Sequence, residues 1–126
     1  MNTISLSISK RIAELAPEWN DTQFHYRPHK NSGGSVDYLV QYRMGNYQSI
    51  LGDVYPAYTL GELLRKLPKE IVIEHNQTGT HYLPDWRAKL VFSHYSAVAD
   101  NPEDAAGLLL CKLLEEGIIN KEVRNG

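Results

Sequence analysis

The sequence predicts an α+β domain with an antiparallel sheet and three helices, in the order α-β-β-α-β-β-α. Three segments repeat their apolar residues with the period of a helix, and the segments between them alternate with the period of a strand. The chain lacks the regular strand-helix-strand alternation that builds a parallel sheet. We therefore expect the helices mainly on one face of the sheet. Residues 1–119 are predicted to form this single domain, and the polar residues 120–126 a flexible tail.

The first helix is expected at residues 6–16. Ile8, Ile12 and Leu15 recur at the spacing of one helix face, and a proline follows the segment. Residues 4–8 also alternate in the manner of a strand, so a strand is the alternative reading of this start.

A β-hairpin is predicted at residues 23–43. Apolar and polar residues alternate on both sides of residues 31–35, whose Asn, Ser and Gly residues favour a turn. A glycine-rich turn also binds phosphate where a helix begins directly after it, but here a strand pattern follows. A further short edge strand is expected at residues 47–51.

The second helix is predicted at residues 59–67 by a capping box, in which Thr59 and Glu62 each hydrogen-bond the other's backbone N–H. Four leucines then form one stripe that is expected to be buried. They are Leu60, Leu63, Leu64 and Leu67.

A second hairpin is expected from the strand at residues 71–73 and a return strand at residues 86–95. On the return strand, Trp86, Ala88, Leu90 and Phe92 share one face, which is predicted to face the core, and His94 is in phase with them. The last helix is expected to begin at Asp100 or Asn101 and to end at Gly117.

Two histidines are the candidates for a metal site. His75 and His81 flank a five-residue loop, and Asp85 supplies a nearby carboxylate. A divalent metal needs at least three such ligands, so a small metal-dependent hydrolase is one alternative function. The spacing matches no recognised metal motif, and both histidines also read as ordinary polar residues at strand ends. We therefore predict no metal and no cofactor.

The sequence gives no support to an enzyme, although it does not exclude one. Cys111 lies in an apolar helix, where a thiol is a small core residue rather than a nucleophile. His25 and His29 fall on a strand, and the carboxylates are scattered singly, without the pairing that hydrolytic chemistry uses.

Tyrosine is the unusual feature of the composition, with eight residues against two phenylalanines. Tyrosine suits half-exposed sheet surfaces and protein interfaces, so a protein partner or self-association is expected. Aromatic residues beside Arg27, Lys30 and Arg43 also suit single-stranded nucleic acid, which is a second alternative. The formal net charge of -2 makes nucleic acid the less favoured partner.

Composition also bears on the compartment. A single cysteine forms no intramolecular disulfide, no apolar run reaches the roughly 20 residues that span a bilayer, and serines interrupt the apolar residues near the start. The sequence therefore predicts a cytoplasmic protein without a membrane partner.

Three stretches resemble a known group of proteins. They are the capped segment at residues 55–64, the tryptophan-bearing strand, and the closing helix from Asn101 to Gly117. Together they are similar to small proteins of unknown activity encoded by bacterial phages and prophages. The resemblance implies a phage-related setting and brings no catalytic or binding residues with it.

Overall fold

The computed structural model describes residues 2–42, 51–75 and 85–119. Within them the chain forms three helices and six strands, which confirms the α+β class and the alternation of helices with antiparallel hairpins. Each hairpin gains a third strand. The elements are α1 (Leu6–Leu15), β1 (Phe24–Lys30), β2 (Val36–Tyr42), β3 (Tyr55–Pro56), α2 (Leu60–Lys66), β4 (Ile71–His75), β5 (Trp86–Leu90), β6 (Ser96–Ala99) and α3 (Pro102–Glu115).

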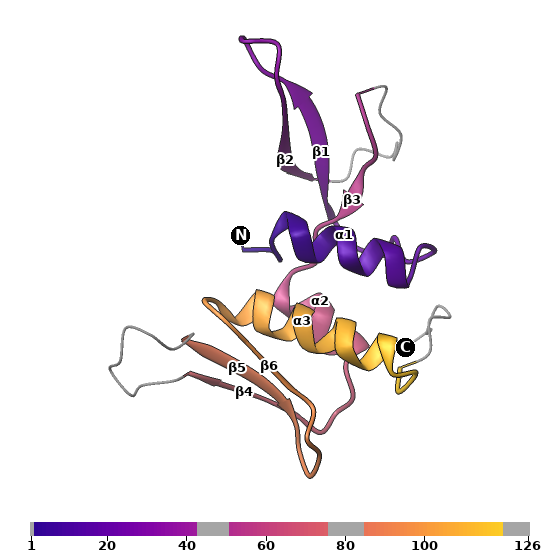
Figure 1. Cartoon of the computed structure of the whole chain (residues 1–126), viewed down its shortest axis with the longest axis vertical. Helices are drawn as coiled ribbons and strands as arrows, with labels where there is room; N and C mark the ends of the chain where they lie inside the picture. The colour runs from indigo at the N-terminus through magenta and orange to yellow at the C-terminus, as the bar shows by residue number, and fades with distance from the viewer. Residues whose placement is uncertain (1, 43–50, 76–84, 120–126) are drawn as a thin grey trace.

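The strands divide between two antiparallel sheets instead of forming the one sheet expected. Their orders are β2-β1-β3 and β4-β5-β6. In Figure 1 the first sheet lies above α1 and the second lies below α3, so the helices occupy the middle of the molecule. The short helix α2 joins β3 of the first sheet to β4 of the second, and this connection carries the chain from one side of the helices to the other.

The core is centred on α3. This helix packs against α1 and α2, and also against β5 and β6. It is therefore apolar around most of its circumference, and its leucines at positions 109, 110, 113 and 114 are all buried. Gly107 lies where α1 comes closest: a Cβ added there would lie 2.8 Å from Ile8 Cγ2.

The predicted capping box starts α2. Glu62 N donates to Thr59 Oγ1 over 3.3 Å, and Thr59 N donates to Glu62 Oε1 over 2.9 Å. The Glu62 carboxylate also accepts from the Thr22 hydroxyl and from Gln23 N. One side chain therefore fixes both the start of α2 and the residues that lead into β1.

The predicted ends of α3 are also confirmed. Asn101 Oδ1 accepts from Asp104 N over 2.8 Å at the start of the helix. At its end Gly117 has a φ of 72°, and Ile118 N donates to Leu113 O over 2.9 Å. This pair of features is the Schellman arrangement, which needs a residue that tolerates the left-handed region.

The segment before α1 is tied to three distant parts of the fold. Ile4 N donates to Tyr58 O over 3.0 Å, and Ile4 O accepts from the Tyr26 hydroxyl over 2.7 Å. Ser5 N donates to Asp104 Oδ1 over 2.7 Å. The alternative of a long strand at the start is thus limited to one isolated bridge, and the helix is the correct reading.

The prediction of one long strand at residues 86–95 was wrong. The chain leaves β5 at Leu90, turns, and returns as β6. Ser93 closes this turn, because both its N–H and its hydroxyl donate to Leu90 O. Phe92, expected in the core, has a φ of 61° in the turn and is fully exposed, and His94 is exposed as well.

Several predicted features lie outside the described residues. They are the tail at 120–126, the loop at 76–80, His81, and the edge strand at 47–51 apart from Leu51. Among the helices that the structure describes, none is both long enough and apolar enough to cross a membrane.

Candidate functional site

The predicted metal ligands are only partly described. His75 ends β4 and is exposed, with its ring centroid 4.8 Å from that of Trp86. Asp85 is exposed just before β5, and His81 lies outside the described residues. In the described ranges no three side chains of His, Cys, Asp or Glu are grouped closely enough to hold a metal.

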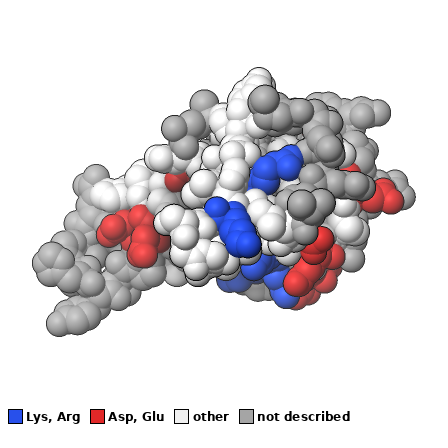
Figure 2. Space-filling model, turned by 90° about the horizontal axis from the view of Figure 1, so that it is seen from above, with Lys and Arg blue, Asp and Glu red and all other residues white. Residues whose placement is uncertain are grey.

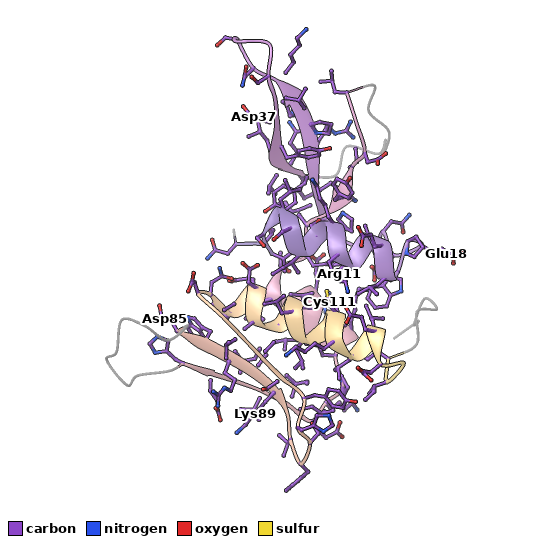
Figure 3. All side chains as sticks on the ribbon, viewed as in Figure 1. Arg11, Glu18, Asp37, Asp85, Lys89 and Cys111 are labelled. Carbon is purple, nitrogen blue, oxygen red and sulfur yellow. The ribbon has the colours of Figure 1, made fainter. Side chains whose placement is uncertain are left out.

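Cys111 lies in an environment that disfavours the thiolate, and two of the singly scattered carboxylates lie apart from each other. Cys111 is buried in the core beside α1, where burial raises the pKa of its thiol to about 12 although the charge of Arg11 lowers it. Figure 3 shows Cys111 and Arg11 at the junction of the two helices, with Asp37 on the first sheet and Asp85 at the second. These two carboxylates are too far apart to act together.

A cavity of about 640 Å³ lies beside α2. Trp19 and Asp21 line it together with three cationic residues of α2 and the segment after it, Arg65, Lys66 and Lys69. Lys66 Nζ donates to Asp21 Oδ2 over 2.7 Å and lies 4.2 Å from the centroid of the Trp19 ring.

Lys66 and Asp21, which line this cavity, already have partners. Burial raises the pKa of Asp21. The hydrogen bond and the charge of Lys66, together with the hydrogen bond from the Tyr58 hydroxyl, lower that pKa by more than burial raises it, so the net shift is downward. Burial is also the main cause that raises the pKa of Tyr58. The ion pair therefore fastens the segment after α1 to α2, which is a structural role.

The tyrosines in the described ranges do not form one surface. Tyr58 is fully buried, and the Tyr26 hydroxyl is used to hold Ile4 O. The rings of Tyr38 and Tyr55 lie 5.8 Å apart, with Lys10 Nζ within 5.6 Å of both centroids. Tyr47 and Tyr82 lie outside the described residues.

Among the described elements, strand β2 instead carries the largest set of exposed apolar side chains. Of the ten large apolar side chains that are exposed in the described residues, four belong to this strand. We call them the hairpin patch: Val36 (46% exposed), Leu39 (51%), Val40 (40%) and Tyr42 (60%). They lie on both faces of the strand, because Leu39 is one residue out of phase with the other three.

The position of β2 in the fold explains this exposure. It is the outer strand of its sheet in the order β2-β1-β3, and β3 is the strand of that sheet that packs against α1. In Figure 1 the hairpin of β1 and β2 projects away from the helices, and no described element lies beside the outer edge of β2. Its side chains thus have no core to enter.

The alternation of Val36, Tyr38, Val40 and Tyr42 predicted this strand but not its set of exposed apolar side chains. Leu39 was missed. The available signal was the run Tyr38-Leu39-Val40, which places apolar residues on both faces of a strand.

Figure 2 looks onto the molecule from above, the side of the first sheet. On this face Lys and Arg form small groups separated by Asp, Glu and uncharged residues. The described residues of this face thus form no continuous basic stripe of the kind that tracks a nucleic-acid backbone.

Comparison of the chain with protein families, with curated proteins and with solved structures gives no match. The similarity to phage and prophage proteins therefore stays a prediction.

Proposed function

We propose that this protein is a non-enzymatic binding protein of the cytoplasm, with a phage-related origin, and that it binds a protein chain through β2. The observation that carries the proposal is the hairpin patch on an outer strand. Exposed apolar surface favours association at about 25 cal/mol for each Å² that is removed from water. Apolar groups gathered on one projecting strand are typical of an interaction site.

The backbone of β2 adds a second source of affinity. An outer strand presents unpaired N–H and C=O groups, and an extended partner chain forms main-chain hydrogen bonds with them. The side chains of the hairpin patch then supply contacts on both faces. This combination favours a protein partner over nucleic acid, because the only charged residue of β2 is the acidic Asp37.

A site-specific crosslink tests this proposal. A photoreactive benzoylphenylalanine replaces Leu39 in the full chain expressed in bacterial cells, and the same group replaces Val98 as the matched control. Val98 is 41% exposed on β6, another outer strand. We expect position 39 to capture a protein, either a second copy or a foreign chain, well above position 98. Equal capture at the two positions overturns the proposal.

A further inference from the structure

We infer that the chain bound by β2 is β2 of a second copy, paired antiparallel about a twofold axis at Leu39. This inference rests on the proposed function, because it names the partner of the same strand. It would join the two first sheets into one six-stranded sheet in the order β3-β1-β2-β2-β1-β3.

The hydrogen-bond pattern of the hairpin shows which main-chain groups of β2 face away from β1. Asn31 N donates to Ser35 O over 2.8 Å, and Ser35 N donates to Asn31 Oδ1 over 3.1 Å, so these two residues occupy a hydrogen-bonded position of the ladder. Such pairs alternate along an antiparallel ladder, and the register therefore turns the main-chain groups of residues 37, 39 and 41 toward β1. The main-chain groups of residues 36, 38, 40 and 42 point outward instead.

The same alternation appears on the other side of β1, which supports this assignment. Ala57 N donates to Phe24 O, so an even-numbered residue of β1 faces β3. The missing N–H of Pro28 also falls on that side, away from β2.

With Leu39 opposite Leu39 of the second copy, β2 is complementary to itself. All seven residues are paired, and the outward-facing residues meet one another as hydrogen-bonded pairs, with about eight main-chain bonds in total. Val36 lies opposite Tyr42, and Tyr38 lies opposite Val40. Apolar groups therefore meet apolar groups on the continuous face.

Charge also favours this register. Asp37 is the only charged residue of β2 and lies opposite the uncharged Gln41 of the second copy. Its carboxylate accepts from Asn31 Nδ2 over 2.8 Å, on the β1 side of the strand. A register that set Asp37 against Asp37 would place two like charges directly opposite, which destabilises a strand pair.

β2 lacks the usual features that keep an outer strand from pairing. Such strands are commonly short, or carry lysine, proline or a bulge. β2 has seven residues in unbroken register and contains none of these three features. In the second sheet, by contrast, β6 has four residues, and Glu74 of β4 forms an ion pair with Lys89 at 3.0 Å.

A single cysteine at position 39 tests the register. Opposite residues in a non-hydrogen-bonded pair have Cα atoms about 4.5 Å apart, within the range that a disulfide spans. Leu39→Cys should therefore form a disulfide-linked dimer under mild oxidation. Gln41→Cys is the matched control, because position 41 lies roughly 14 Å from its counterpart, four residues along the strand.

Two further samples make the result specific. The unmodified chain should give no disulfide dimer, because buried Cys111 has a pKa of about 12 and stays protonated at about pH 8. A mixture of Asp37→Cys with Gln41→Cys should give the crosslinked heterodimer. Circular dichroism checks that each variant is folded, which we expect because all three positions lie outside the core.

Light scattering after size exclusion measures the unmodified protein across a concentration series. We expect twice the chain mass of 14.3 kDa, and a return to one chain mass for Leu39→Lys. A monomer at every concentration overturns the inference, and so does equal crosslinking at positions 39 and 41. If the protein is a monomer while position 39 captures a foreign chain in cells, the proposed function stands and this inference fails. If it is a monomer and captures nothing, both fail.

Discussion

Replacing Gly107 by alanine should destabilise the protein, although alanine is the better helix former. The added Cβ would lie 2.8 Å from Ile8 Cγ2 and 3.0 Å from Ile4 Cγ2. Carbon atoms in favourable contact are roughly 3.5–4.0 Å apart, so α1 would have to move away from α3 by about half an ångström or more. Ile4 and Ile8 are both buried, so neither side chain can simply turn out into solvent.

The two opposing effects set the size of the loss. Alanine in the interior of a helix gains about 1 kcal/mol over glycine. Overfilling a packed core costs about 1–3 kcal/mol, and two simultaneous contacts place this site in the upper half of that range. We expect a net loss of about 1–2 kcal/mol in the free energy of unfolding, which lowers the melting temperature by roughly 4–8 °C.

Urea unfolding followed by circular dichroism measures this loss. Gly61→Ala in α2 is the control, because a Cβ added there meets no atom within 4 Å, and it should leave stability unchanged or raise it. Adding Ile8→Leu to Gly107→Ala removes the Cγ2 atom in closest contact and should restore part of the loss. A Gly107→Ala protein as stable as the unmodified chain would refute the close packing of α1 on α3.

Two further predictions concern single side chains. The pKa of Asp21 is lowered in the folded state, so its ion pair stabilises the fold above the unfolded pKa of about 3.9 and is lost as the pH falls through the folded value. Asp21→Asn should therefore narrow the difference between urea midpoints measured at about pH 6 and about pH 3, and an unchanged difference would contradict the ion pair with Lys66. Phe92→Gly should leave stability unchanged or raise it by about 1 kcal/mol, because it relieves a left-handed backbone and removes no buried surface. If thermal unfolding instead shows a loss of about 3–5 kcal/mol in the free energy of unfolding, as for a core phenylalanine, Phe92 does not lie exposed in a turn.

The parts of the fold that were predicted from the sequence depend on neighbouring residues. Thr59 and Glu62 are three residues apart, and Gly117 ends α3 through bonds to residues of the last turn. Their geometry is fixed by the local chain, so a short stretch of sequence is enough to specify it.

The errors depend on contacts between distant residues. Nothing in the alternation of residues 86–95 marks Ser93 as the residue that closes a turn. Its hydrogen bonds to Leu90 O replace a regular strand only where β6 can pair with β5, and that pairing depends on the rest of the fold. The division into two sheets has the same origin. Strand patterns indicate which residues are extended, but not which strands they pair with.

For a related reason, the sequence predicted the strand of the candidate site but not the exposure of its apolar side chains. The period of two correctly indicated β2, and an alternating strand normally has one covered face. Whether a helix covers that face depends on the path of the whole chain. In this fold α1 packs against β3 and leaves the hairpin patch uncovered.

The packing of Ile4 and Ile8 against α3 has a consequence for how the protein folds during its synthesis. A ribosome releases Ile4 and Ile8 long before Gly107, yet these residues pack against one another in the finished core. Until α3 emerges, the apolar side of α1 stays open to water and to chaperones that bind nascent chains. Completion of the core must therefore wait until α3 has been synthesised, and a stall before α3 would leave a chain prone to aggregate.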